Sequence, residues 1–235
     1  MDEPLLGAQN YLAAVGVQAR VRPNVIVLFD ESGLPSRSPA SRLRGRLARS
    51  ATSSGHPFRT LEGLSDEVDL IVASPGSAVM GVTVELLAAM GARRIVTVGA
   101  AAAIAPLAGN DVCVAARAES DGPGLDYPST CDHGDPELTA RLAATLSARP
   151  VTVVSTDVPF RQSPDRLATH EADVLDMEIA ALFRVADVVG VDAAAVVIVS
   201  DHYTANDWRP GDPGSFADTL RTAVAGVHGL LEGIR

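Results

Sequence analysis

The chain contains no lysine, because all 19 of its cationic side chains are arginines. A lysine Schiff base is therefore impossible, which excludes pyridoxal phosphate enzymes and lysine-dependent aldolases. A Walker A phosphate loop is excluded as well, since that motif requires a lysine. The 29 acidic residues bring the net charge to −10. Such an acidic chain is poorly suited to the phosphate backbone, so we expect no nucleic acid partner.

Aromatic residues are scarce, at 4% of the chain, whereas apolar residues make up 47%. No apolar run reaches the roughly 18 residues that a membrane span needs. The acidic start MDEPLLGAQN lacks the basic and apolar regions of a secretory signal. These features predict a cytoplasmic protein with no membrane partner. In that compartment we expect Cys113 and Cys131 to be reduced thiols rather than a disulfide.

Short apolar runs, mostly rich in β-branched residues, have the pattern of strands buried on both faces. They lie at Val25–Phe29, Val68–Ala73, Arg94–Gly99, Asp111–Ala115, Val151–Ser155 and Ala193–Ser200. Helical patterns lie at Val82–Met90, Pro136–Arg149, Met177–Val189 and Phe216–Ile234. Strands alternating with helices predict a single three-layer α/β/α domain over residues 1–235, with a central, mostly parallel mixed sheet.

Two stretches lack a regular pattern, Asp30–Gly55 and Glu119–Asp135. Both are long for structureless loops in a compact domain, so they are candidates for functional loops. The first contains a cluster of arginines, namely Arg37, Arg42, Arg44, Arg46 and Arg49. A solvated basic face and a contact to an anion or a second subunit both fit this cluster.

Two segments carry candidate chemistry. The sequence VLDMEIAALF places Glu178 at the start of a predicted helix, and VVIVSDH places Asp201 at the end of a predicted strand. In open α/β sheets the carboxyl ends of the strands face the ligand crevice. Each acid also fits a structural role, because Glu178 can complement the helix dipole and Asp201 can cap a turn.

Together these segments resemble the purine nucleoside phosphorylase and uridine phosphorylase superfamily, which also includes methylthioadenosine and AMP nucleosidases. The match consists of Met177, Glu178 and Ala181 in a Met-Glu-x-x-Ala run, followed by Ser200 and Asp201 at a strand end. The pair Asp201-His202 is most similar to the purine-specific branch. Ser77–Gly99 and Val154–Pro164 resemble two further family segments. The resemblance implies a nucleoside phosphorylase-like fold.

The resemblance also implies a role for each matching residue. Asp201 would bind the base and act as a general acid toward the departing purine. Glu178 would accept hydrogen bonds from both ribose hydroxyls, and Met177 would pack under the sugar. Phe160 would stack on the base. No cofactor is implied, and because family sites often lie at subunit contacts we expect a homo-oligomer, whether dimer, trimer or hexamer.

Phosphate is the co-substrate of the phosphorylases, and the match to their phosphate site is partial. Gly33–Arg37 has the spacing of the family's Gly-x-Pro-x-Arg turn, and Gly99 corresponds to the glycine of a second phosphate-binding loop. Thr97 and Ala100 stand where the family has an arginine and a hydroxyl residue. The sequence therefore favours, slightly, phosphorolysis to a free base and a pentose 1-phosphate, with Gly33, Arg37 and Gly99 as phosphate ligands.

Two alternatives stay open. A nucleosidase of the same family would use water in place of phosphate, with an extra carboxylate such as Asp30 or Glu31 near the first strand. A relative that binds nucleosides without turnover is the second alternative, and the run Ala100–Ala103 favours it.

Other motifs carry little weight. Cys131 and His133 with His202 lack the spacing of a four-ligand zinc site, so we expect no metal. Trp208 follows Asp201 closely, and it fits either a side chain that closes over the pocket or one that packs against the last helix.

Overall fold

The computed structural model describes residues 6–14, 16, 20–33, 58–122, 126–204 and 207–234. The strands are β1 (Asn24–Leu28), β2 (Phe58–Gly63), β3 (Val68–Ala73), β4 (Arg94–Ala103), β5 (Val112–Ser120), β6 (Arg149–Ser155), β7 (Val174–Asp176), β8 (Asp192–Tyr203) and β9 (Trp208–Pro210). The helices are α1 (Ala8–Ala14), α3 (Ser77–Met90), α4 (Pro136–Leu146), α5 (Pro164–Leu167), α6 (Ile179–Val189) and α7 (Pro213–Glu232), with short 3₁₀ turns η1 (Glu31–Gly33) and η2 (Pro159–Arg161).

The strands form one mixed sheet in the order β2-β3-β1-β4-β7-β6-β5-β8-β9. Parallel pairs join β1 to β3 and β4, β4 to β8, and β6 to both β5 and β7. Because β8 pairs with β4 as well as with β5, the strands β4, β7, β6, β5 and β8 close into a ring. The mixed, mostly parallel sheet was predicted from the sequence, whereas the ring closure was not.

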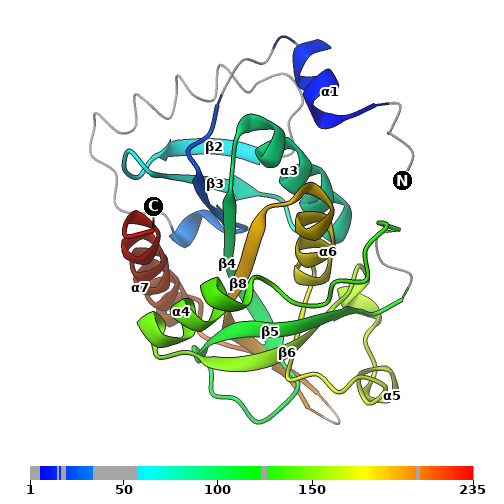
Figure 1. The fold of residues 1–235 in the computed structure, drawn as a ribbon. Helices are drawn as coiled ribbons and strands as arrows, with labels where there is room; N and C mark the ends of the chain where they lie inside the picture. Colours follow the sequence, from blue (N-terminus) through cyan, green and yellow to red (C-terminus); the bar gives the residue numbers. More distant parts are fainter. Residues whose placement is uncertain are drawn as a thin grey trace.

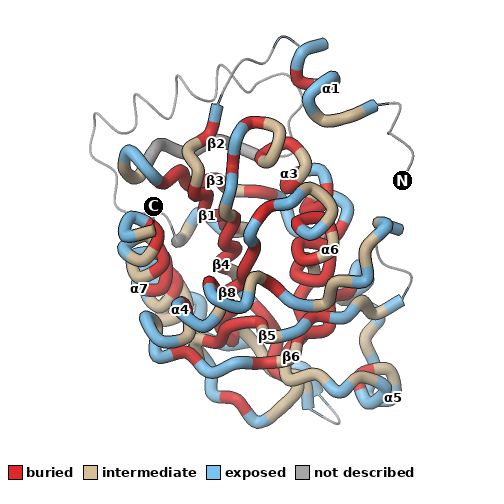
Figure 2. Tube along the Cα trace, viewed as in Figure 1, coloured by how far each residue is buried: buried red, intermediate tan, exposed pale blue. Residues whose placement is uncertain are grey.

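Helices cover both faces of the sheet (Figure 1). On one face α3 packs against α6, and α1 packs on α3; on the other face α4 packs against α7. Strand β1 shows why its sequence is apolar from Val25 to Leu28. Val25 and Val27 join the core under α3 and α6, while Ile26 and Leu28 join the core under α7. Successive side chains point to opposite faces, so a strand between two helical layers is buried on both (Figure 2).

Several predicted elements differ at their ends. The helix predicted from Val82 begins at Ser77, and the helix predicted to reach Arg149 ends at Leu146, where Ser147 adopts a left-handed conformation with φ 50°. Strands β4 and β8 run beyond Gly99 and Ser200, to Ala103 and Tyr203. In the extended part of β4, Ala102 and Ala103 pair with Leu175 and Val174 of β7. Among the described residues, no helix is both long and apolar enough to span a membrane.

Candidate active site

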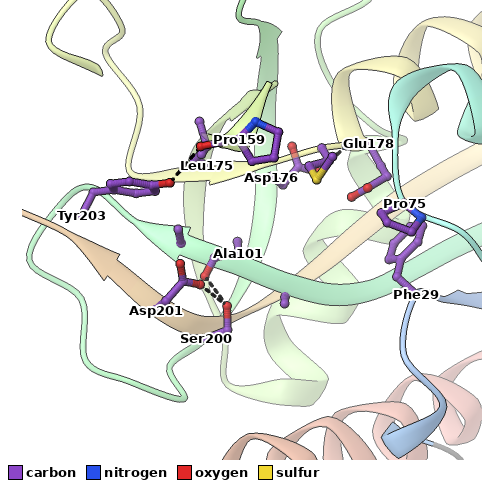
Figure 3. A pocket seen from close by; sticks show the side chains of 13 residues that line it. Phe29, Pro75, Ala101, Pro159, Leu175, Asp176, Glu178, Ser200, Asp201 and Tyr203 are labelled. Atoms are coloured by element: carbon purple, nitrogen blue, oxygen red, sulfur yellow. Dashed lines mark hydrogen bonds between the residues drawn. The ribbon is translucent and has the colours of Figure 1, made fainter. Parts of the chain in front are cut away.

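A cavity of about 230 Å³ opens where β4, β7 and β8 end (Figure 3). It is lined by Phe29, Pro75, Ala100, Ala101, Ala102, Pro159, Leu175, Asp176, Met177, Glu178, Ser200, Asp201 and Tyr203. The structure therefore brings Glu178 and Asp201, the two acids singled out in the sequence, into one cavity. In Figure 3 Glu178 lies toward Pro75 and Phe29, whereas Asp201 lies toward Tyr203.

Glu178 is the N-cap residue of α6, at the turn that follows β7, and it is only 5% exposed. The backbone N–H of Gly76 donates a hydrogen bond of 2.7 Å to Oε1 of Glu178. Burial raises the pKa of Glu178 above its ordinary value, and the negative charge of Asp176 raises it further. In the free protein the protonated form of Glu178 is therefore favoured.

Asp176 is a cavity residue that the sequence analysis did not single out. Its Oδ1 accepts a hydrogen bond of 2.5 Å from Ser155 Oγ, and its Oδ2 accepts from the backbone N–H groups of Glu178 (3.0 Å) and Ile179 (2.9 Å). These bonds cap the start of α6 and hold the turn that carries Glu178. The signal in the sequence was the position of Asp176 directly before the Met-Glu pair, at the end of a short strand.

Met177 lies beside Glu178 in the lining, and its backbone carbonyl accepts a hydrogen bond of 3.2 Å from Ser77 Oγ. Ser77 is the first residue of α3, so this bond and the bond from Gly76 to Glu178 both tie the start of α3 to the Met-Glu turn. The position of Met177 is compatible with packing under a sugar, and that role stays a prediction.

Asp201 lies in β8, and both of its carboxylate oxygens accept hydrogen bonds. Ser200 Oγ donates to Oδ1, and the indole N–H of Trp208 donates to Oδ2 at 2.6 Å. Tyr203, two residues further along the strand, also lines the cavity, and its hydroxyl donates to the carbonyl of Pro159 at 3.3 Å. Burial, followed by the nearby charge of Asp201, raises the pKa of Tyr203.

The structure does not bring Phe160 into the cavity. Its side chain is 94% exposed, and the residue before it, Pro159, lines the cavity instead. Both lie in the 3₁₀ turn η2, where successive side chains point about 120° apart. Phe160 therefore points outward in this structure, so its expected stacking on a base gains no support within one subunit and stays a prediction. The aromatic residues that do line the cavity are Tyr203 and Phe29, which the sequence analysis did not select.

Of the three residues expected to bind phosphate, the structure places two. Gly33 ends the turn η1, and Arg37 lies outside the described residues. Gly99 is part of strand β4 rather than of a loop, because β4 continues through the alanines to Ala103. A Cβ atom on Gly99 would lie 2.8 Å from Cδ2 of Phe29. The described structure thus explains Gly99 by its close contact with the Phe29 ring.

The acids proposed near the first strand are also placed. Asp30 Oδ1 accepts a hydrogen bond of 2.6 Å from the backbone N–H of Ser32, so Asp30 stabilises the turn that follows β1. Glu31 begins η1. Neither lines the described cavity. The acids in the lining are Asp176, Glu178 and Asp201, and among the described lining residues none is basic.

Comparison with known proteins agrees with the fold and the motifs. The sequence model of the Phosphorylase superfamily matches residues 44–234, so the chain belongs to this superfamily. Among curated proteins, none matches the sequence significantly.

The fold is also similar to those of solved structures. A 5′-methylthioadenosine/S-adenosyl homocysteine nucleosidase from Campylobacter jejuni is 13% identical, with a TM-score of 0.67 over 91% of this chain and 100% of that one. A purine nucleoside phosphorylase from Toxoplasma gondii is 17% identical, with a TM-score of 0.66 over 90% of each chain. An AMP nucleosidase from Bacteroides thetaiotaomicron is 17% identical, with a TM-score of 0.67 over 97% and 100%. At these identities the similarity establishes the fold, shared by phosphorylases and nucleosidases alike.

Proposed function

We propose that this protein cleaves the N-glycosidic bond of a purine-type nucleoside in the cavity lined by Glu178 and Asp201. The proposal depends on one observation: these two acids line the same cavity, one from the β7–α6 turn and the other from β8. Cleavage of this bond develops positive charge on the sugar and negative charge on the departing base. One acid beside the sugar and another beside the base meet both needs.

Asp201 would serve as the general acid that protonates or hydrogen-bonds the base as the bond breaks, an effect typically worth about 10²–10⁴-fold in rate. Glu178 would accept hydrogen bonds from two neighbouring ribose hydroxyls. A carboxylate accepts such a pair best when it is ionised. Because the free protein favours protonated Glu178, sugar binding would be coupled to the release of its proton.

The acceptor of the sugar is the second part of the proposal. The described lining contains three acids and no basic residue, so it supplies no cationic donor for a phosphate dianion. We therefore propose water as the acceptor, which makes the reaction hydrolysis. Phosphorolysis, which the sequence favours slightly, is the second candidate, because Gly33–Arg37 retains the spacing of a phosphate turn. The proposal includes no cofactor. A cytoplasmic homo-oligomer stays a prediction.

The test is release of base from inosine and adenosine with and without phosphate. Equal release in both conditions, with free ribose as product, supports hydrolysis; release that depends on phosphate and yields ribose 1-phosphate supports phosphorolysis.

The variant Asp201→Asn should lower kcat by about 10²-fold or more with little change in KM. Asp207→Asn, an exposed acid of the same hairpin, is the matched control. Nucleoside binding without release in the wild type would favour the non-catalytic relative.

A further inference from the structure

Trp208 is the only tryptophan of the chain, and it lies beside the cavity. Trp208 is 51% exposed, which is unusual for so large an apolar side chain. The indole N–H nevertheless donates a hydrogen bond of 2.6 Å to Oδ2 of Asp201. The sequence left two roles open for Trp208, closing over the pocket or packing against the last helix. Packing against the helix does not explain this contact.

The hairpin of β8 and β9 explains how Trp208 reaches the acid. The strands pair antiparallel, with Tyr203 opposite Trp208 and Asp201 opposite Pro210. Side chains two residues apart share a face of a strand, so Asp201, Tyr203 and Trp208 lie on one face of the hairpin. Trp208 is the diagonal neighbour of Asp201, and a diagonal neighbour is within reach of an aromatic side chain.

The chain around the hairpin holds this arrangement in place. The backbone N–H of Thr204 donates to the carbonyl of Asp207 at 2.8 Å, next to the turn. After β9, the backbone N–H of Gly211 donates to the carbonyl of Ser200 at 2.8 Å. A Cβ atom on Gly211 would lie 2.2 Å from that carbonyl oxygen, so only glycine allows this approach. The hairpin is thus fixed on both sides of Trp208.

The indole N–H suits a carboxyl group that gives up a proton. An indole donates but does not accept, so Trp208 cannot take the proton that Asp201 is to transfer. Once the proton has left, Asp201 becomes a carboxylate, and a hydrogen bond to a charged oxygen is stronger than one to a neutral group. Trp208 on Oδ2 and Ser200 on Oδ1 also fix the plane of the carboxyl group.

We propose that Trp208 is a positioning residue, whose indole N–H orients the Asp201 carboxyl group and stabilises the carboxylate formed on proton transfer to the base. This inference rests on the proposed function, because it assigns Asp201 as the acid. It predicts an effect on the chemical step, whereas a simple stacking contact with the substrate would act mainly on binding.

The test compares Trp208→Phe with the wild type for cleavage of inosine or adenosine. Phenylalanine keeps an aromatic ring and removes the N–H. We expect kcat to fall about 5- to 20-fold with KM changed less than about 2-fold. Arg209→Ala, an exposed residue of the same strand, should stay within about 2-fold of the wild type.

Three kinetic results would overturn the inference. The first is an unchanged kcat in Trp208→Phe, and the second is a rise in KM alone. The third is an equal loss in Arg209→Ala, which would show a general need for the hairpin. Because Trp208 is the sole tryptophan, its fluorescence tests the contact without turnover. Asp201→Asn should shift the emission of the free protein, and an identical spectrum would also overturn the inference. An inactive wild type with shifted emission would refute the proposed function and, with it, the catalytic part of this inference, while the contact itself would stand.

Discussion

The backbone N–H of Gly76 donates to Oε1 of Glu178, a residue 102 positions further along the chain. Gly76 has φ 116°, a conformation that side chains other than that of glycine rarely adopt. The bond joins the N-terminal ends of α3 and α6, the two helices that pack together on one face of the sheet. It fixes a buried carboxyl group that borders the cavity, and the protonation of this group links stability to activity.

Replacing Glu178 with glutamine should stabilise the protein at alkaline pH. The pKa of Glu178 is raised from its ordinary value of 4.5 to about 8. Between these two pH values the folded state binds more protons than the unfolded state. The free energy of unfolding contributed by Glu178 therefore falls as pH rises through that window. Glutamine cannot ionise, so Glu178→Gln should unfold at a higher temperature than the wild type at pH 8, by about 2–4 °C for each kcal/mol.

The advantage of the variant should shrink toward pH 5, where the wild-type carboxyl group is protonated as well. In the same variant, kcat/KM should fall roughly 100-fold, since two hydrogen bonds from the sugar to a charged acceptor are weakened. Thermal unfolding at several pH values and steady-state kinetics measure both effects. If Glu178→Gln loses stability at pH 8, the raised pKa of Glu178 is contradicted. If the variant has the kinetics of the wild type, Glu178 does not belong to the sugar site.

A second acid, Asp121, anchors the segment that carries Pro159 to the cavity. Its side chain is 6% exposed, and it accepts hydrogen bonds from the side chains of Arg166, Gln162, Thr156 and His170. Burial alone would raise the pKa of Asp121, but these bonds outweigh burial and lower it to about 2. The acid joins the end of β5 to the chain between β6 and α5.

Asp121→Asn should therefore destabilise the protein by about 1–2 kcal/mol at pH 7. Because the pKa is lowered on folding, the stabilisation is present above the ordinary value of 3.8 and is lost as the pH falls toward 2. Denaturant unfolding at pH 7 and pH 3 should show the difference between variant and wild type shrinking at the lower pH. Asp165→Asn, an exposed acid in α5, is the control. An equal loss in both variants would argue against the network.

The sequence predicted the elements of the site better than its surroundings. Glu178 and Asp201 were found because each follows a strongly apolar strand or precedes a regular helix, and such patterns place side chains at a known edge of the sheet. Asp176 was missed because a three-residue strand is too short to show a period. The outward direction of Phe160 was not foreseen, because it depends on the turn η2, which no periodic pattern reveals.

The ring of strands also lay beyond prediction from the sequence. Its closure depends on β8 pairing with β4 at one side and with β5 at the other, contacts between residues far apart in the chain. The alanines that follow Gly99 were interpreted as a loop because the family resemblance places a phosphate-binding loop there. They form the end of β4, where Ala102 pairs with both Leu175 and Asp201, and small side chains there leave room for the cavity.

Gly99→Ala tests whether Gly99 serves a packing contact or a phosphate. The added Cβ would lie 2.8 Å from Cδ2 and 3.3 Å from Cε2 of Phe29, so the ring must move. Overpacking of this kind typically costs about 1–3 kcal/mol. Because Phe29 lines the cavity, its displacement should also raise KM for the nucleoside. Thermal unfolding and kinetics of the single variant give the size of both effects.

The double variant Gly99→Ala with Phe29→Leu separates the two explanations. If Gly99 serves only to admit the ring, the smaller leucine relieves the clash, and Gly99→Ala should cost little stability in that background. The difference between the two backgrounds is the coupling energy, which contacting residues typically show at about 0.5–3 kcal/mol. If instead the backbone of Gly99 approached a phosphate, the loss of activity in Gly99→Ala would persist beside leucine and would depend on phosphate concentration. Additive effects of the two substitutions, with a phosphate-dependent loss, would restore Gly99 to the phosphate site that the sequence suggested.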